Sequence, residues 1–466
     1  MTGTGSQLRI DGNGDGSKIS LGLRFDPLLP GGTGQLLIEN DGSVELTDSA
    51  LAPFGRNVVV QVGEEATGEI ALDNGTLSLL SSGDTNLSFA EHTRGQGTLL
   101  ATNGSVVELL SQAGNASSQL GNTSGANKTA NLIFDDSDLM IAVDDGDASF
   151  QVGGVNTVAQ AQFSGAGTDV SISAGGVTNG SADVRVGDSA GANSNLLLES
   201  GASMVIDGST SSRLRIGDND AVSASVNVLD SSALSVVGGQ SARIQVGAGN
   251  DLAAPASLNL TGTAVVSTSG DVILGNGRGD RALNGIVSLG DSSTLNASEV
   301  AVNGGGVLQG TGTVTGNVAV NALGILGPGL SPGVLTIDGD LTLNTDAGLF
   351  FEFGGTGANQ SDYLTVLGDF IVNDMFSLTL SFINGYSPQG SEVLEFLDVG
   401  GNLDSSFFSL ADIEILGLAD SRTFSLVSDG NTIATQFDPI AAIPVPLPAG
   451  LLLTSFLCLG LLRRRH

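Results

Sequence analysis

Three short segments decide the fold: VRVG at residues 184–187, LRIG at 214–217 and IQVG at 244–247. They lie 30 residues apart, and each alternates aliphatic with polar residues before it ends in glycine. Related segments end at other glycines of the chain, namely Gly63, Gly121, Gly153 and Gly275. Such a period predicts a repeat architecture in which each repeat is one small structural unit.

A second series of runs shares this period. Each member places a turn between two aliphatic runs, and the turns are centred on Gly42, Gly75, Gly104, Gly201, Ser231, Gly262 and Ser292. Val, Ile, Leu, Ser and Thr fill the runs, whereas Gly, Asn and Asp fill the breaks, which is strand and turn chemistry. Two independent markers therefore indicate coils of about 30 residues with three short strands each.

A unit of three short strands cannot bury its aliphatic face alone, but stacked units can. Each strand then pairs with its equivalents about 4.8 Å above and below. We therefore predict an all-β fold in which residues 1–325 form a parallel β-helix. Gly187, Gly217 and Gly247 are expected to stack at equivalent corners. The alternative is an array of β-sandwiches, which normally have aromatic cores and turns every 8 to 12 residues or so.

Composition excludes several classes of function. The chain has 466 residues with 49 acidic and 16 basic ones, for a net charge of -33. The only lysines are Lys18 and Lys128, so the basic stripe that nucleic-acid binding needs is absent. One cysteine, Cys458, excludes internal disulfides. Two histidines, His92 and His466, are too few for a zinc site built on His and Cys.

Larger side chains gather near the C-terminus. Eleven of the 18 Phe lie between residues 350 and 437, which predicts a C-terminal β cap over residues 326–440. Such a cap hides the open edge strand of a solenoid from other chains. The segment GTGTVTGNVAVNALGILGPGLSPGVLTIDGD (310–340) resembles the closing coils of autotransporter passenger domains. That resemblance implies a secreted β-helical surface protein.

Residues 441–466 form a tail in three parts. The first is a proline motif made of Val445, Pro446, Leu447, Pro448 and Ala449. An apolar run follows, and we expect a short C-terminal hydrophobic helix from Ala449 to Leu462, about 21 Å long. The third part is a basic cluster of Arg463, Arg464 and Arg465, which the positive-inside rule places on the cytoplasmic side.

This order of parts resembles the VPLPA variant of the PEP-CTERM sorting tail of Gram-negative bacteria. The resemblance implies export, recognition of the tail by an exosortase in the inner membrane, and removal of the helix. The body is then delivered to the cell surface or the exopolysaccharide matrix. A plain C-terminal anchor is the alternative, and it leaves the proline motif unexplained. Residues 1–26 lack the basic start and apolar segment of a signal peptide, so we expect the true start upstream.

Two acidic segments offer candidate calcium ligands, since Ca²⁺ prefers oxygen donors. Asp11, Asn13 and Asp15 match the start of a calcium loop, although its twelfth position is Gly22 rather than glutamate. The second segment contains Asp135, Asp136, Asp138, Asp144, Asp145 and Asp147. The alternative for both is a solvated turn on an acidic surface. We expect no other cofactor.

Catalytic constellations are weak. Ser189 lies in a G-x-S-x-G match, but Gly187 is a repeat marker. The base is missing too, because His92 is expected about three coils away and His466 lies in the tail. An outward ladder of arginines is expected from Arg185, Arg213, Arg215 and Arg243, which recur at the repeat period. It could contact anionic sugars, or pair with Asp188 and Asp218. We therefore expect a non-enzymatic structural or adhesive protein, and the alternative is a polysaccharide lyase or hydrolase on a pectin-lyase-like β-helix.

Overall fold

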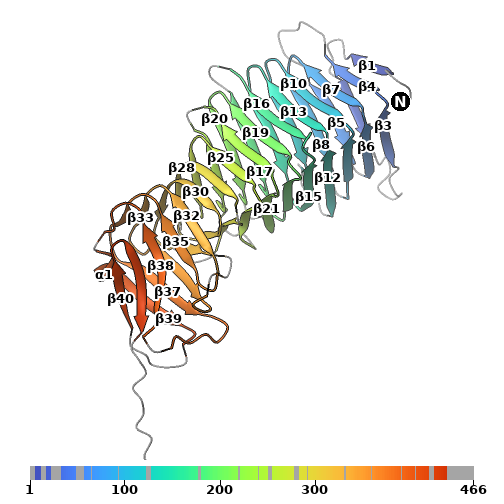
Figure 1. Cartoon of the computed structure of the whole chain (residues 1–466). Helices are drawn as coiled ribbons and strands as arrows, with labels where there is room; N and C mark the ends of the chain where they lie inside the picture. Colours follow the sequence, from blue (N-terminus) through green and yellow to red (C-terminus); the bar gives the residue numbers. More distant parts are fainter. Residues whose placement is uncertain are drawn as a thin grey trace, which may run out of the picture.

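The structure is an all-β solenoid of stacked parallel strands (Figure 1). It is a computed structural model, which describes residues 6–437 apart from 12–16, 22–32, 49–56, 65, 93, 122–126, 177–179, 219–220, 240, 250–253, 278–282, 291, 330–331, 358, 390, 405 and 419–423. Within this part the only helix is the single turn α1 (Phe407–Leu410). The predicted parallel β-helix is therefore confirmed.

One strand of each coil joins a 14-stranded parallel sheet. Its members are β3 (Gly34–Glu39), β6 (Thr67–Asp73), β9 (Gln96–Thr102), β12 (Lys128–Asp135), β15 (Thr157–Ser164), β18 (Asn193–Glu199), β21 (Ser223–Val228), β24 (Ala256–Leu260), β27 (Gly285–Leu289), β29 (Gly306–Gly310), β31 (Ile325–Pro328), β34 (Gly348–Phe353), β37 (Phe376–Phe382) and β39 (Ala411–Leu416).

The other two strands of each coil form two ladders that merge into a 27-stranded sheet. The first ladder holds β1 (Gln7–Asp11), β4 (Ser43–Thr47), β7 (Thr76–Ser81), β10 (Val106–Ser111), β13 (Asp138–Val143), β16 (Asp169–Ala174), β19 (Ser203–Gly208), β22 (Ala233–Val237), β25 (Val265–Thr268), β32 (Val334–Asp338), β35 (Tyr363–Val366) and β38 (Val393–Val399). The second holds β2 (Ser17–Leu21), β5 (Val58–Val62), β8 (Thr85–Phe89), β11 (Ala116–Leu120), β14 (Ala148–Val152), β17 (Ser181–Val186), β20 (Ser211–Ile216), β23 (Arg243–Val246), β26 (Asp271–Leu274), β33 (Leu341–Leu343) and β36 (Phe370–Val372). The strands β28 (Thr294–Val302) and β30 (Thr313–Val320) belong to both ladders.

The glycine column is confirmed. Gly187, Gly217 and Gly247 each follow strands that pair in register, and each donates its N–H to the coil before it at 2.8 or 2.9 Å. All three have φ between +68° and +76°, the left-handed region that favours glycine. Gly121 belongs to the same column. The copy between Gly63 and Gly121 ends instead in Ala90, whose φ is +51° and whose N–H reaches the carbonyl of Val62.

The core is the aliphatic interior of the coils. Residues alternate buried and half-buried along nearly every strand, as in β20, where Leu214 and Ile216 are buried. Three phenylalanines fill the middle coils, where the ring of Phe163 lies 5.4 Å from that of Phe134 and 6.2 Å from that of Phe150. A contiguous apolar column of this kind is the main source of stability in a solenoid.

Coil length changes between β27 and β31. Val287 pairs with Leu308 and Leu308 with Leu326, which are steps of 21 and 18 residues instead of about 30. The coils shorten because β28 and β30 run through a corner that elsewhere needs a turn. Parallel pairing then continues through β34, β37 and β39.

Antiparallel pairing closes the C-terminal end of the solenoid. The hairpin of β40 (Phe424–Asp429) and β41 (Thr432–Phe437) pairs with β38. Phenylalanines pack beneath it, with the ring of Phe382 lying 5.5 Å from that of Phe437. No helix of the described chain has the length and hydropathy to cross a bilayer. The sorting tail at 441–466, with its expected helix, lies outside the described residues.

Candidate functional site

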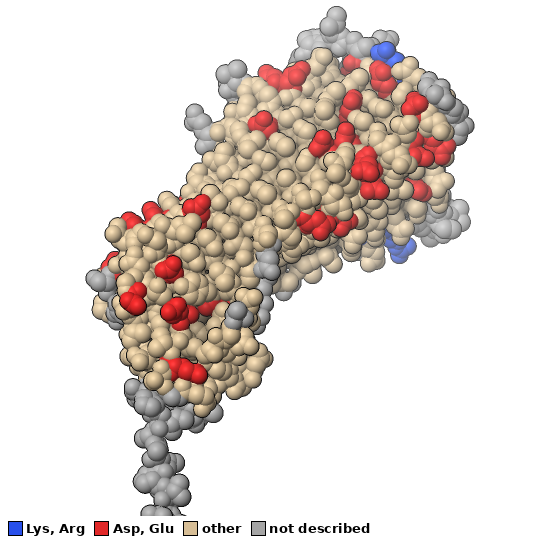
Figure 2. Space-filling model, in the orientation of Figure 1, with Lys and Arg blue, Asp and Glu red and all other residues tan. Residues whose placement is uncertain are grey.

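Acidic side chains are scattered over the visible face of the solenoid, and few basic ones accompany them (Figure 2). Several hollows in the described surface are lined by charged side chains, and two of these places bear on function. The first lies at the C-terminal coils around Asp362, and the second lies over the arginines of β20 and β23.

Asp362 is a buried carboxylate immediately before β35, with only 2% of its surface exposed. Its Oδ1 accepts the N–H of Gly333 at 3.0 Å, and its Oδ2 accepts the N–H of Glu352 at 2.7 Å. Asp362 thereby joins three segments of adjacent coils. Burial raises the pKa of this carboxyl to about 7, against the two hydrogen bonds, which favour the charged form.

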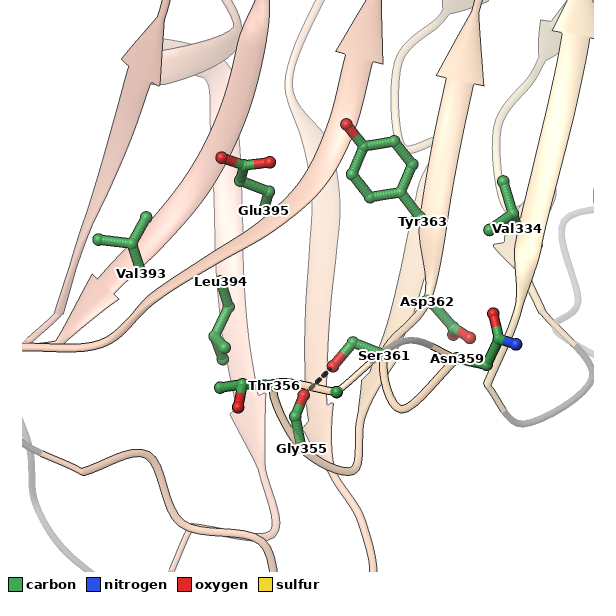
Figure 3. A pocket seen from close by; sticks show the side chains of 11 residues that line it. Val334, Gly355, Thr356, Asn359, Ser361, Asp362, Tyr363, Val393, Leu394 and Glu395 are labelled. Atoms are coloured by element: carbon green, nitrogen blue, oxygen red, sulfur yellow. Dashed lines mark hydrogen bonds between the residues drawn. The ribbon is translucent and has the colours of Figure 1, made fainter.

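Asp362 lines two hollows. The larger, of about 360 Å³, also contains Ser361, Tyr363 and Glu395. Figure 3 shows Tyr363 and Glu395 on adjacent strands, with the Ser361 hydroxyl donating to the carbonyl of Gly355 at 2.6 Å. The smaller, of about 330 Å³, contains Glu352. The arrangement brings three carboxyl groups to one region of the cap, and one of them is poised to exchange a proton near neutral pH.

Our sequence reasoning missed Asp362. The sequence does contain a signal that could have identified it. Asp362 takes an inward position in the alternation that continues with the buried residues Leu364 and Val366. An inward acid in a sequence of aliphatic coils points to a buried hydrogen-bonded carboxyl.

The raised pKa of Asp362 gives a pH-dependent stability. A carboxyl that titrates at about 7 when folded and at its ordinary value of 3.8 when unfolded binds its proton more tightly in the folded state. Its stabilising contribution is therefore full below the unfolded value and is lost as pH rises toward 7. We expect the melting temperature to fall between about pH 4.5 and about pH 7.5, and to fall more steeply in the wild type than in Asp362→Asn.

Asp362→Asn loses one hydrogen-bond acceptor at every pH, which lowers its absolute stability. The comparison therefore uses the slope of the melting temperature against pH. Glu395→Gln is the control, since this exposed carboxylate lines the same hollow and should leave the slope unchanged. Equal slopes for wild type and Asp362→Asn, measured by thermal unfolding monitored with circular dichroism, would contradict the assignment.

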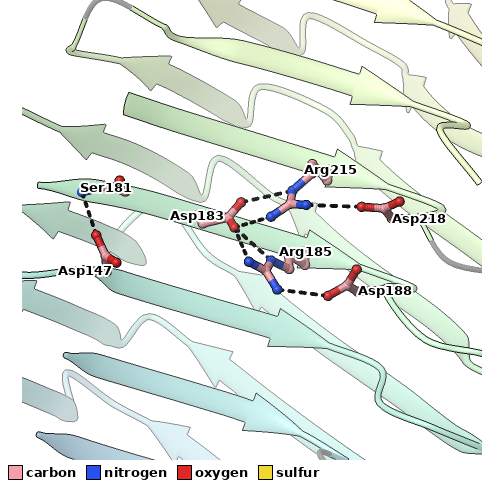
Figure 4. Close-up of polar contacts among 7 residues, drawn as sticks. All are labelled: Asp147, Ser181, Asp183, Arg185, Asp188, Arg215 and Asp218. Atoms are coloured by element: carbon pink, nitrogen blue, oxygen red, sulfur yellow. Dashed lines mark hydrogen bonds and ion pairs between the residues drawn. The ribbon is translucent and has the colours of Figure 1, made fainter. Parts of the chain in front are cut away.

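Two of the four arginines of the ladder, Arg185 and Arg215, form ion pairs with aspartates (Figure 4). Arg185 and Arg215 are neighbours in register on β17 and β20, and both contact Asp183, at 2.7 and 2.5 Å. Each also pairs with the aspartate three residues later, Asp188 or Asp218, at 3.1 Å. The expected pairing with neighbouring aspartates is confirmed for Arg185 and Arg215.

Arg215 is held charged by these contacts. Partial burial lowers its pKa, but the hydrogen bond to Asp183 and the charges of three aspartates raise it above the ordinary value. Arg213 and Arg243 stand one coil apart beside it, over a hollow of about 210 Å³. Neither has an ion pair with any residue that the structure describes, although Asp183 and Asp271 adjoin them in register.

The six aspartates of the second candidate calcium segment do not converge. Asp135, Asp136 and Asp138 lie at one end of β13, and Asp144, Asp145 and Asp147 lie at the other. A strand of six residues separates the two groups by about 20 Å.

Several of these carboxylates accept hydrogen bonds from the next coil. Asp138 accepts the N–H of Asp169 at 3.0 Å, and Asp147 accepts the N–H of Ser181 at 3.1 Å (Figure 4). Of the first candidate segment, Asp11 ends β1, whereas Asn13 and Asp15 lie outside the described residues. Calcium binding at either segment stays a prediction.

Comparison with known proteins gives no further guidance. No protein-family model matches the chain, and no curated protein is recognisably similar in sequence.

Proposed function

We propose that this chain is an exported protein whose β-helix serves a structural or adhesive role at the cell surface or in the exopolysaccharide matrix. The observation that carries the proposal is the tail at 441–466, with its proline motif, apolar run and arginine cluster. An exosortase would recognise this tail in the inner membrane of a Gram-negative cell and remove the helix.

The outer surface of the solenoid supports a structural role. Asparagines stack along it from coil to coil, with Asn259 donating to Asn227 at 2.9 Å and Asn227 to Asn195 at 2.7 Å. A second ladder runs through Asn303, Asn321, Asn344 and Asn373. These side chains hydrogen-bond one another, which suits a long rod that keeps its register.

The alternative function is a polysaccharide lyase or hydrolase, and the hollow at Asp362 is the observation that favours it. Such a site would need two carboxylates with an arginine or lysine beside them. The described residues that line the Asp362 hollows include no arginine or lysine, and the hollow over Arg213 includes only one carboxylate. This distribution favours the structural role.

Changing Pro446 and Pro448 to Ala should trap the full-length protein in the inner membrane. The two prolines are expected to stop the hydrophobic helix from extending upstream. Without them the helix can lengthen toward the thickness of a hydrocarbon layer, about 30 Å. The chain would be expressed behind a Sec signal peptide in a host that carries an exosortase. Mass spectrometry of membrane and secreted fractions gives the result.

The wild-type secreted protein should lack the residues after about Ala449. Pro388→Ala, which changes a proline far from the tail, is the control and should be processed like the wild type. Recovery of an intact Arg463–Arg465 terminus from the cell surface would overturn the sorting proposal and leave only an anchor.

A further inference from the structure

Acidic residues recur at one corner of the solenoid, each immediately after the residue that belongs to the glycine column. Asp188 and Asp218 occupy this position, and each is neutralised by the arginine three residues before it. Glu64 and Glu91 occupy it in earlier coils, after Gly63 and Ala90. The strand position that carries arginine in the later coils holds Gln61 and Ser88 in these two. The corner of these earlier coils therefore carries acidic residues, as the later coils do, but no arginine at the strand position that neutralises them.

A histidine stands beside these two acids. Carboxylate oxygens of Glu64 and Glu91 and a ring nitrogen of His92 lie within 4.8 Å of one another. The His92 Nε2 is 3.7 Å from the Glu64 Oε1. The backbone N–H of His92 also donates to the backbone carbonyl of Glu64 at 2.9 Å. Among the described residues, this is the one place where three such donors converge.

One oxygen of the group has no hydrogen-bond partner among the residues that the structure describes. It is the buried Oε2 of Glu64, and an uncompensated buried carboxylate oxygen is costly. The His92 side chain is 48% exposed, so the group opens to solvent on that side. A cation entering there would satisfy the orphaned oxygen.

A second layer of side chains holds Glu91 in place. Gln61 donates its Nε2 to the Oε2 of Glu91, and Ser20 donates its hydroxyl to the Oε1 of Gln61 at 3.3 Å. Lys128 is buried and lies near Glu91. Even with this one basic side chain beside the group, the two carboxylates outnumber it.

We propose that Glu64, Glu91 and His92 bind one divalent transition-metal ion such as Zn²⁺. Two carboxylates and one imidazole suit such an ion, whereas Ca²⁺ prefers ligands that are all oxygen. Gln61 is then a positioning residue for the Glu91 ligand. Because Glu64 and Glu91 belong to successive coils, the ion would clamp the coil of β5 to that of β8.

Isothermal titration of the untagged full-length chain in mild detergent with ZnCl₂ tests the proposal. We expect one Zn²⁺ per chain at this group, with Ca²⁺ binding there weaker by about tenfold or more. Glu64→Gln and His92→Ala should each weaken the Zn²⁺ affinity by at least about tenfold, and Gln61→Met by roughly tenfold. With Co²⁺ in place of Zn²⁺, visible absorption should appear in the wild type and be lost in His92→Ala.

Two controls separate this group from other metal donors. Asp188→Asn changes the equivalent corner acid of a later coil, and His466→Ala removes the other histidine, so both should bind as the wild type does. Circular dichroism checks that each variant is folded. The proposal is overturned if Zn²⁺ does not bind, if binding survives both Glu64→Gln and His92→Ala, or if His466→Ala abolishes it.

Discussion

Gly247→Ala should lower the free energy of unfolding by about 3 kcal/mol or more, the sum of backbone strain and a steric clash. Gly247 has φ +76°, where an added Cβ is disfavoured. That Cβ would also lie 2.2 Å from the carbonyl oxygen of Asn284 in the next coil. The contact is with backbone, so relief requires one coil to move away from its neighbour and weakens their hydrogen bonds.

Gly104→Ala separates the two contributions. Gly104 has φ +77°, but an added Cβ would meet no atom within 4 Å. This variant should lose only about 1 kcal/mol, the cost of the left-handed backbone alone. Urea unfolding of both variants, followed by circular dichroism, measures the difference. Equal losses would mean that the stacked corner of Gly247 is not packed as tightly as the structure places it.

Phe163→Ala should cost about 3–5 kcal/mol, the range for removing a fully buried aromatic side chain. Phe163 is inaccessible to solvent and lies between Phe134 and Phe150. The surrounding strands are paired on both sides, β15 with β12 and β18, so they cannot collapse into the cavity. The loss should appear in urea unfolding and as faster proteolysis near the middle coils.

Phe163→Leu is the matched variant, because it keeps a large apolar side chain in the same place. It should cost less, roughly 1–2 kcal/mol, because it removes fewer buried atoms and leaves a smaller cavity than Phe163→Ala does. A loss in Phe163→Ala as small as that in Phe163→Leu would show that the aromatic stack is not part of the rigid core.

The architecture was predictable because its causes are local. Aliphatic alternation in segments such as LRIG sets which side chains point inward, and glycine at positive φ sets the corner. The pairing of Arg185 with Asp188 and of Arg215 with Asp218 was also readable, since each pair is three residues apart across one corner. These features depend on residues that are close in the chain.

Contacts between coils were not predictable to the same degree, because coil length varies. Leu132 pairs with Ala161 and Ala161 with Leu196, steps of 29 and 35 residues, so a fixed period does not give the true neighbours. The approach of His92 to Glu64 depends on such steps. So does the hydrogen bonding of Asp362 to Gly333 and Glu352.

The acidic segment around Asp135 gives the clearest contrast. Its six carboxylates are close in sequence, but a strand between them carries the two halves to different corners. Glu64 and Glu91 are 27 residues apart and meet at one corner. Local residue chemistry is enough to specify strands, corners and an aliphatic interior. Which polar groups meet is decided by the register of one coil on the next, because parallel pairing joins residues a whole coil apart.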